Sequence, residues 1–384
     1  MARGQIIPRG KSSFRVMVYA GRDPVTRKER RLTGTARSRR EAEKLLTRLL
    51  SQLDEQRRPA TGATLGYLLD RWLETVNLEL TTRHTYEGYI NRNIRPVLGD
   101  LKLVKLTVDV LDRYYADLRK RGGVGDRPMG AGTVRKIHFI LRAALNLAVR
   151  WQWLPSNPAA LASPPPFIQK EVHPPTPEDV AKLIEAAWAA DPDFGALLWL
   201  AMTTGARRGE LCGLRWRAVR LAERDLVVSR SYVQRGGQRQ EKDTKTHQSR
   251  RLALDEVTVA VLTEHLERCR AHARVCGVEL AADAFVFSLS PDGRTPLLPD
   301  SVSQRFRRLA ERVGISTTLH SFGRHFSATQ LLAGGVDVRT VAGRLGHGGG
   351  GATTLRVYSH FVAAADRRAA ELLGKAVPRP GQQG

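Results

Sequence analysis

Residues 203–216 read TTGARRGELCGLRW, and the second half of the chain is best interpreted from this stretch. Glycine adopts the tight backbone conformations that turns require, so Gly205 predicts a turn that leads into a helix. Arg207 follows this turn, which aims its guanidinium out of the fold. Glu210 comes three residues later on the same helical face, where its carboxylate could orient nearby donors. A guanidinium is a rigid, permanently charged fork that matches a phosphate.

Two later stretches carry further polar side chains that are suited to the same chemistry. Residues 242–255, KDTKTHQSRRLALD, predict a polar hairpin turn that feeds a strand. This turn would place Lys245 at a mobile tip, where its amine could protonate a leaving oxygen as a general acid. Residues 319–335, LHSFGRHFSATQLLAGG, predict the start of an amphipathic helix that carries three cationic or titratable residues, His320, Arg324 and His325.

A run of four glycines separates a histidine from a tyrosine in residues 345–361, LGHGGGGATTLRVYSHF. His347 precedes the run, and Tyr358 lies eleven positions after that histidine. Considered alone, Tyr358 is explained most simply as a tyrosine buried in the core. A functional interpretation therefore depends on the residues elsewhere in the chain.

The composition indicates a polyanionic partner. The chain has 384 residues, with 62 Lys and Arg against 38 Asp and Glu and a formal net charge of +24. Such an excess points to nucleic acid first and to an anionic membrane second. No stretch approaches the roughly 18 apolar residues of a membrane span, and the opening MARGQIIPRGKSS lacks the apolar core of a signal peptide. We expect a bacterial cytoplasmic, nucleoid-associated protein that binds no membrane.

The sequence does not indicate a metal site or a cofactor. Cys212, Cys269 and Cys276 form no CxxC pair, which favours reduced thiols over a disulfide framework or a zinc site. The phosphate-cradling pattern GxxxxGKS/T and the zinc pattern HExxH are both missing from the sequence, so an ATP-driven or zinc-hydrolase function lacks a motif. We therefore expect no metal and no cofactor.

Residues 1–58 predict a small basic module of strands and one helix. FRVMVYA (14–20) and ERRLTGT (29–35) flank the turn-rich GRDPVTRK, which predicts a strand, a turn and a strand. Ser38 and Glu41 form a capping box that opens the helix EAEKLLTRLLSQL. The first 50 residues hold 14 Lys and Arg against 4 Asp and Glu. This charge favours an appendage that contacts DNA over a merely solvated face.

Beyond a hinge at RRPATGA, the rest of the chain divides into three parts and a tail. Residues 64–155 contain segments with apolar residues at three- and four-residue steps, which predict a helical bundle. The proline-rich residues 156–175 predict a linker. Residues 176–374 predict a mainly helical domain with strands at DLVVSRSYVQ and SRRLALD, and residues 375–384 predict a flexible tail. The expected fold class is α+β, mostly α, with a small hairpin or sheet in the last domain.

In their order and spacing, these motifs resemble the signature of the tyrosine recombinase, or phage integrase, family. That signature runs TGxRxxEL, KT on a β-hairpin, HxxR near a helix start, LGH, and then a tyrosine. This sequence supplies TGARRGEL, KTHQSRR, HSFGRH, LGH and TTLRVYSH in the same order. Residues 64–155 look like the family's SAM-like core-binding domain. Residues 1–58 look like the arm-binding domain of lambda-type integrases.

The resemblance implies strand cleavage, independent of metal and ATP, through a 3′-phosphotyrosyl bond. Tyr358 would attack a backbone phosphate and release a 5′-hydroxyl. Charge on the phosphoryl oxygens would be stabilised by three residues, Arg207, Arg324 and His347. Lys245 would protonate the leaving oxygen, and His320 would assist proton transfer from the tyrosine. Glu210 would support the cluster. The four glycines would then either let the segment swing Tyr358 to the phosphate or form a loop with no such role.

The sequence departs from the family pattern at one place. His320 and Arg324 are four residues apart, because SFG occupies the place of two residues in HxxR. One possibility is that His320 still serves and the extra residue is absorbed at the helix start. The other is that Ser321 takes the position of the histidine, which would leave a weaker proton acceptor. His325 follows Arg324 as in the family box, so Arg324 anchors the alignment.

The leading hypothesis is site-specific recombination, that is, integration and excision of a mobile element or phage, by a homotetramer on double-stranded DNA. Its DNA would include an attachment-site core and arm sites, and accessory DNA-bending or directionality proteins are further implied partners. Two alternatives stay open: a type IB topoisomerase, and a DNA-binding relative with weak or lost catalysis. The basic residues that we expect to contact DNA are Arg9, Lys11, Arg15, Arg27, Lys28, Arg30, Arg31, Arg83, Arg92, Arg135 and Lys136.

Overall fold

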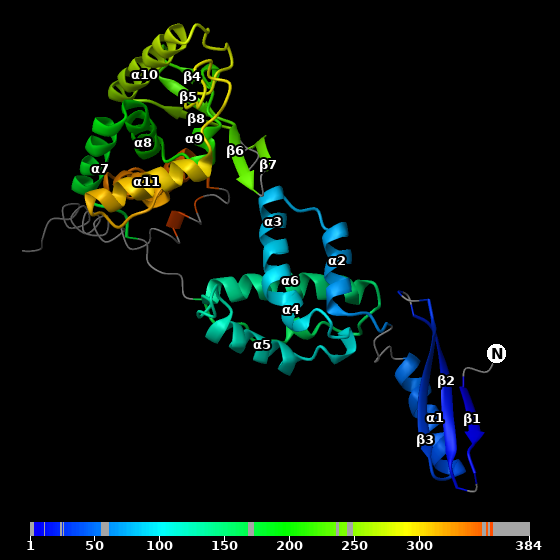
Figure 1. Ribbon diagram of the computed structural model, residues 1–384. Coiled ribbons are helices and arrows are strands. Elements are labelled where there is room, and N and C mark those ends of the chain that lie inside the picture. Colours follow the sequence, from blue (N-terminus) through cyan, green and yellow to red (C-terminus); the bar gives the residue numbers. More distant parts are fainter. Residues whose placement is uncertain are drawn as a thin grey trace, which may run out of the picture. The chain divides into compact units, whose positions relative to one another are not determined.

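The computed structural model (Figure 1) has the α+β, mostly helical fold that the sequence predicts. It forms two compact units, Met1–Gln169 and Lys170–Gly384, and each is described by itself. The residues that the structure describes are 4–10, 12–23, 25, 27–54, 61–167, 173–235, 238–243, 249–347, 351 and 354–355.

A three-stranded antiparallel sheet and one helix form the first part of unit 1 (Figure 1). The strands pair in the order β1-β2-β3, and α1 packs on one face of the sheet; the bounds are β1 (Gly4–Pro8), β2 (Phe14–Arg22), β3 (Glu29–Ala36) and α1 (Arg39–Asp54). Val16, Val18 and Leu32 point toward this helix and are buried, because side chains alternate between the two faces of a strand. The two predicted strands are confirmed. The sequence did not predict β1, because GQIIP is short and lacks an alternation of apolar and polar residues.

The structure has one of the two hydrogen bonds of the capping box predicted at the start of α1. The backbone N–H of Glu41 donates to Oγ of Ser38 over 3.2 Å. The Glu41 carboxylate in turn accepts from the backbone N–H of Arg37 over 3.0 Å, one residue before the cap. The first bond satisfies a backbone donor that a helix start otherwise leaves without a partner, and the second holds the residue before the cap.

Helices enclose the second core of unit 1, as the apolar spacing predicts. The core is built on fully buried residues such as Leu68, Leu111 and Ile137. A π-helical turn continues α3 at Ile90–Ile94. The α-helices of this part are α2 (Leu65–Thr75), α3 (Leu80–Tyr89), α4 (Arg95–Leu98), α5 (Val108–Arg121) and α6 (Ala131–Arg150).

The start of the proline-rich stretch packs against this helical core. Pro158–Ala160 form a 3-10 turn, and Ala159 is fully buried in the core. The backbone N–H of Ser163 donates to Oδ1 of Asp112 over 2.7 Å. Proline excludes an α-helix here, but it is compatible with a short turn that buries one small side chain, that of Ala159.

Unit 2 is built around helix α8 (Pro192–Thr204), which is apolar on nearly all sides and contacts α7, α10 and α12. Helices that are hydrophobic all round are typical of a protein interior. The flanking helices are α7 (Pro177–Ala190), α10 (Glu256–Val275), α11 (Pro299–Val313), α12 (Phe326–Ala333) and α13 (Val338–Leu345). Among the described residues, no helix is long and apolar enough to span a membrane.

Two small antiparallel arrangements complete unit 2. A sheet in the order β4-β5-β8 and a hairpin of β6 and β7 contain β4 (Val219–Arg220), β5 (Asp225–Val228), β8 (Arg250–Ala253), β6 (Arg230–Arg235) and β7 (Gln238–Asp243). The predicted strand DLVVSRSYVQ is thus divided at Ser229, because its first part pairs with β8 and its second part with β7. Strand β7, QRQEKD, has polar residues only and gives no alternating signal.

A buried imidazole ties α10 to α8 in unit 2. His265 is 2% exposed; its Nδ1 lies 3.0 Å from Oδ1 of Asp193, and its Nε2 lies 2.7 Å from the carbonyl oxygen of Val286. Burial lowers the pKa of His265, but the hydrogen bonds with Asp193 and Cys269 outweigh it and raise the pKa to about 9. The bond with His265, together with Arg268, lowers the pKa of Asp193 to about 2. The ring is therefore an imidazolium at neutral pH.

This pair predicts a loss of stability in alkaline solution. Between pH 6.5 and about 9, the folded chain keeps a proton on His265 that the unfolded chain has released. The free energy of unfolding must therefore fall as the pH rises through this interval. Replacing His265 by Gln should remove the alkaline slope and lower stability at pH 7 by about 2 kcal/mol.

Urea unfolding followed by circular dichroism between pH 7 and 10 measures the slope. His272→Gln is the matched control, because His272 lies on the same helix with its side chain exposed. An unchanged slope in His265→Gln would show that other groups govern the alkaline limb.

Candidate active site

Arg207 is held at a sharp junction between two helices. Helix α8 ends at Thr204, and Gly205 caps it in the left-handed conformation with φ of +61°. A Cβ at this glycine would overlap the side chain of Leu345. Arg207 is then the N-cap of α9 (Arg208–Cys212). The turn predicted at Gly205 is therefore present, and both its backbone conformation and its packing require glycine.

The carboxylate of Glu210 binds two arginines at once. Its side chain is 2% exposed. Oε1 accepts from Nη1 of Arg207 over 2.8 Å, and Oε2 accepts from the backbone N–H of Arg207 over 2.8 Å. Arg250 donates to the same two oxygens over 3.2 and 2.6 Å. Burial alone would raise the pKa of Glu210, but the bonds and charges of Arg250 and then Arg207 lower it.

Arg324 lies on a π-helical turn between Ser321 and His325. Its side chain is buried, and Nη1 donates to the carbonyl oxygen of Gly205 over 3.0 Å. A π-turn closes i→i+5 hydrogen bonds and thereby holds one more residue than an α-turn. The helix start therefore has room for the extra residue of HSFGR. The assignment of His320, and not Ser321, to the place of the family histidine stays a prediction.

His320 lies next to the arginines. Its ring meets the ring of His325 edge-on, with 4.7 Å between the centroids. Burial, followed by the charges of His325, Arg324 and Arg207, lowers the pKa of His320 to about 4. The ring is therefore neutral at pH 7 and can accept a proton.

His347 completes the cluster from the end of α13. Gly346 ends this helix in the left-handed conformation, and its carbonyl oxygen accepts from Nη2 of Arg207 over 2.9 Å. Nδ1 of His347 lies 2.8 Å from Oγ1 of Thr354, which is fully buried. Burial, followed by the charges of Arg324 and Arg207, lowers the pKa of His347 to about 4.

The arrangement suits an anion with several oxygens. Two permanently charged guanidiniums and two neutral imidazoles, from separate stretches of unit 2, act on one another electrostatically. Groups of this kind stabilise charge that develops on a phosphoryl centre. Within the described ranges, no group of three or more His, Cys, Asp or Glu residues could hold a metal ion.

Two of the predicted site residues lie outside the described part of the chain. Lys245 falls between the end of β7 at Asp243 and the start of β8 at Arg250. Tyr358 follows Leu355, after which the structure describes no residue. Of the four glycines, only Gly351 is described, with φ of +98°. The proposed swing of the tyrosine segment therefore stays a prediction.

The basic residues predicted to contact DNA differ in their environments. On the face of the sheet opposite α1, Arg15 is half-buried and Arg31 is exposed beside Glu29. Arg83 is half-buried, and its Nη2 donates to the carbonyl oxygen of Leu73 over 2.8 Å near the end of α2. Arg30 is half-buried and Lys11 lies outside the described residues, whereas the exposed members of the set are Arg9, Arg27, Lys28, Arg92, Arg135 and Lys136.

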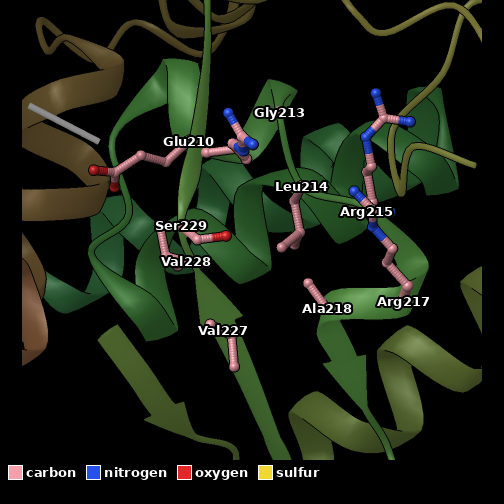
Figure 2. Close-up of a pocket in the computed structure, with 10 residues that line it drawn as sticks. Glu210, Gly213, Leu214, Arg215, Arg217, Ala218, Val227, Val228 and Ser229 are labelled. Carbon is pink, nitrogen blue, oxygen red and sulfur yellow. The ribbon is translucent and has the colours of Figure 1, made fainter. Parts of the chain in front are cut away.

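A separate pocket of about 260 Å³ is lined by residues of α9, β5 and β6 and of the 3-10 turn Trp216–Ala218. Figure 2 shows that the carboxylate of Glu210 points away from the other labelled side chains, toward the opposite side from Arg215 and Arg217. Arg207, Arg324, His320 and His347 do not line this pocket. The candidate site is thus the cluster of arginines and imidazoles and not the pocket.

Two residues that contact the cluster were not singled out from the sequence. Arg250 follows the hairpin that carries Lys245, and Thr354 precedes Tyr358 by four positions. The sequence does not reveal these contacts, because each partner lies more than five residues away in the chain. Arg250 contacts Glu210, and Thr354 contacts His347. A single arginine in the strand-like SRRLALD carries no local signal of such a partner.

Comparison with known families gives two matches along the chain. The phage integrase family matches residues 176–364. The N-terminal SAM-like domain of phage integrases matches residues 64–119. The first match contains all the cluster residues described above.

Relatives of similar sequence extend over nearly the whole chain. A tyrosine recombinase XerC-like protein of Caldanaerobacter subterraneus subsp. tengcongensis is 27% identical, over 96% of this chain and 97% of the relative. The ICEBs1 integrase of Bacillus subtilis is 25% identical, over 91% of this chain and 93% of the relative.

Solved structures of two integrases share the fold. The Tn1549 transposon integrase, in complex with transposon right end DNA, has a TM-score of 0.69 at 18% identity and covers 81% of this chain and 100% of its own. A lambda integrase tetramer bound to a Holliday junction has a TM-score of 0.58 at 20% identity and covers 92% of this chain and 94% of its own.

The two imidazoles of the cluster predict a loss of stability in acid. Unfolded histidines take up a proton below about pH 6.5, whereas the folded His320 and His347 resist protonation until about pH 4. Between these values the unfolded state binds more protons, so the free energy of unfolding falls as the pH is lowered.

The double variant His320→Gln and His347→Gln should show a shallower acid slope than the wild type. Urea midpoints measured between pH 4.5 and 7 test this expectation. Equal slopes in the two proteins would mean that these rings are already protonated in the folded chain.

Proposed function

The chain belongs to the phage integrase family and is a tyrosine-type site-specific recombinase, and from this premise we propose that Tyr358 is the nucleophile that cleaves its DNA. The observation that carries the proposal is the convergence of Arg207, Arg324 and two neutral imidazoles into one cluster. Thr354, which contacts His347, precedes Tyr358 by four residues in the sequence.

The proposed reaction is a transfer of the phosphoryl group from O5′ of DNA to the tyrosine. The phenol oxygen attacks phosphorus, and the bond to O5′ breaks, which leaves a 3′-phosphotyrosyl bond and a 5′-hydroxyl. His320 accepts the phenol proton, and Lys245 supplies a proton to O5′. The phosphodiester energy is kept in the new bond, so the reverse attack by a 5′-hydroxyl rejoins the strand without ATP.

The cluster lowers the barrier by stabilising charge on the phosphoryl oxygens. Arg207 and Arg324 supply permanent positive charge, and His347 adds a hydrogen-bond donor. A bound phosphodiester anion also offsets the cationic charges that lower the pKa of His320. The basicity of this ring should therefore rise in the complex, when a proton acceptor is needed.

We extend the proposal to the organisation of the whole chain. Residues 176–374 would carry the reaction, residues 64–155 would bind the core site, residues 156–175 would link them, and residues 1–58 would bind arm sites. The exposed arginines of the first module and the formal charge of +24 support phosphate contacts. A homotetramer would join two duplexes in the cytoplasm, with accessory DNA-bending or directionality proteins as further partners.

Covalent trapping tests the nucleophile. Wild-type chain mixed with a nicked duplex that carries the attachment core should form an SDS-resistant protein–DNA adduct in EDTA, because the arginines supply the charge. Tyr358→Phe should form none.

An adduct in the phenylalanine variant would assign the nucleophile to another residue. If neither protein forms an adduct although both bind the duplex, the chain is a DNA-binding relative without catalysis.

The register at the π-turn has a test of its own. His320→Ala should slow adduct formation about 100-fold, the usual size of a lost general acid–base group, whereas Ser321→Ala should change the rate less than threefold. Single-turnover rates at saturating DNA measure both. The reverse ranking would place Ser321 in the role of the proton acceptor.

A further inference from the structure

Arg250 is a buried cation that the proposed reaction does not use. It begins strand β8, and its side chain is 10% exposed. All three guanidinium nitrogens are engaged: Nε donates to the carbonyl oxygen of Arg344 over 2.9 Å, and Nη1 and Nη2 donate to the two carboxylate oxygens of Glu210. Each nitrogen of this side chain thus contacts the protein, and little of its surface is exposed to DNA.

Arg207 and Arg250 are arranged as a matched pair around Glu210. Each donates to both oxygens of the carboxylate, and each also reaches a carbonyl oxygen at the end of α13. Arg207 reaches Gly346 over 2.9 Å and Arg250 reaches Arg344 over 2.9 Å. The carboxylate of Glu210 and the end of α13 are thus connected through two arginines.

The end of α13 favours such donors for two reasons. The last carbonyl groups of a helix have no partner within the helix, and they carry the negative end of its dipole. Gly346 leaves little room beside this contact, since a Cβ there would lie 3.0 Å from Nη1 of Arg250. The residue that follows is His347, whose backbone N–H donates to the carbonyl oxygen of Ala342 over 2.9 Å.

We propose that Arg250 is a positioning residue, which uses Glu210 as a bridge to hold the end of α13, and with it His347, in place beside Arg207. The inference rests on the proposed function, because it assigns Arg250 to the geometry of the same reaction. It differs from a role in DNA binding, since the side chain is only 10% exposed and all three of its nitrogens contact other residues of the protein.

The proposal predicts that the rate of cleavage depends on Arg250 while DNA affinity does not. In Arg250→Met, the turn that carries His347 loses one of its two connections to Glu210. A misplacement of about 1 Å in a catalytic group costs on the order of 100-fold in rate. The affinity for core-site DNA, measured in the Tyr358→Phe background, should change less than about threefold, because phosphate contacts made elsewhere dominate affinity.

Arg251 offers a matched control. It is the next residue of the same strand, points to the other face, and has 65% of its side chain exposed beside Asp225. Arg251→Met therefore removes the same charge from β8 without touching the cluster. Arg250→Lys is the second variant; it keeps a cation near Glu210, but a lysine cannot make three separate contacts in this fork geometry.

Two measurements on the full chain decide the proposal. The first is amide hydrogen exchange at residues 343–347 without DNA, which should be faster in Arg250→Met and Arg250→Lys than in Arg251→Met and wild type. The second is the single-turnover rate of adduct formation, which should fall about 100-fold in Arg250→Met. Circular dichroism confirms that each variant is folded under the assay conditions.

A double-mutant cycle distinguishes positioning from general loss of stability. Arg250→Met and Glu210→Gln should each slow the reaction, and Glu210→Gln should slow it more, because Arg207 also loses its partner. The double variant should be little slower than Glu210→Gln alone, because the bridge that Arg250 uses is already gone. Additive losses in rate would overturn the proposal.

The outcomes separate this inference from the proposed function. Unchanged exchange at residues 343–347, or an Arg250→Met rate equal to that of Arg251→Met, overturns the role of Arg250 while the nucleophile assignment stands. A wild-type chain that forms no adduct overturns the proposed reaction, and the exchange result then still decides whether Arg250 holds the turn.

Discussion

The buried carboxylate of Glu210 is the interaction on which the site depends. It binds two arginines from distant parts of the chain. Arg207 donates one guanidinium N–H and its backbone N–H, and Arg250 donates from both of its terminal nitrogens. A buried charge of this kind is costly unless it is fully paired, and here each oxygen has two donors. The geometry of the site is therefore linked to the stability of unit 2, because the same four hydrogen bonds serve both.

Helix α8 supplies the rigid base for this arrangement. Its apolar surface is covered by neighbouring helices, and its C-terminal turn presents Gly205 to two elements of the site. The carbonyl oxygen of this glycine binds Arg324, and Arg207 follows two residues later. A close-packed core resists displacement, so side chains from three stretches keep their relative positions.

Much of this organisation is predictable from local patterns, and the rest is not, for physical reasons. Apolar spacing indicates the helices of unit 1, and the capping pair Ser38 and Glu41 marks the start of α1. The partners of Arg250 and the polar strand β7 are set by tertiary contacts, which leave no periodic trace in the sequence. In the same way, Arg83 looks like a free cation in the sequence but binds backbone carbonyls at the end of α2.

The π-turn at Ser321–His325 gives the helix start room for one more residue than an α-turn would hold. The number of residues between two side chains therefore does not fix their distance in space, because a wider turn can hold the additional residue. A sequence motif with a fixed number of residues between its conserved positions will therefore overlook chains in which the same side chains lie close together in space. A comparison based on which residues face each other would group such chains correctly, and insertions next to a functional helix need not indicate that a lineage has lost its chemistry.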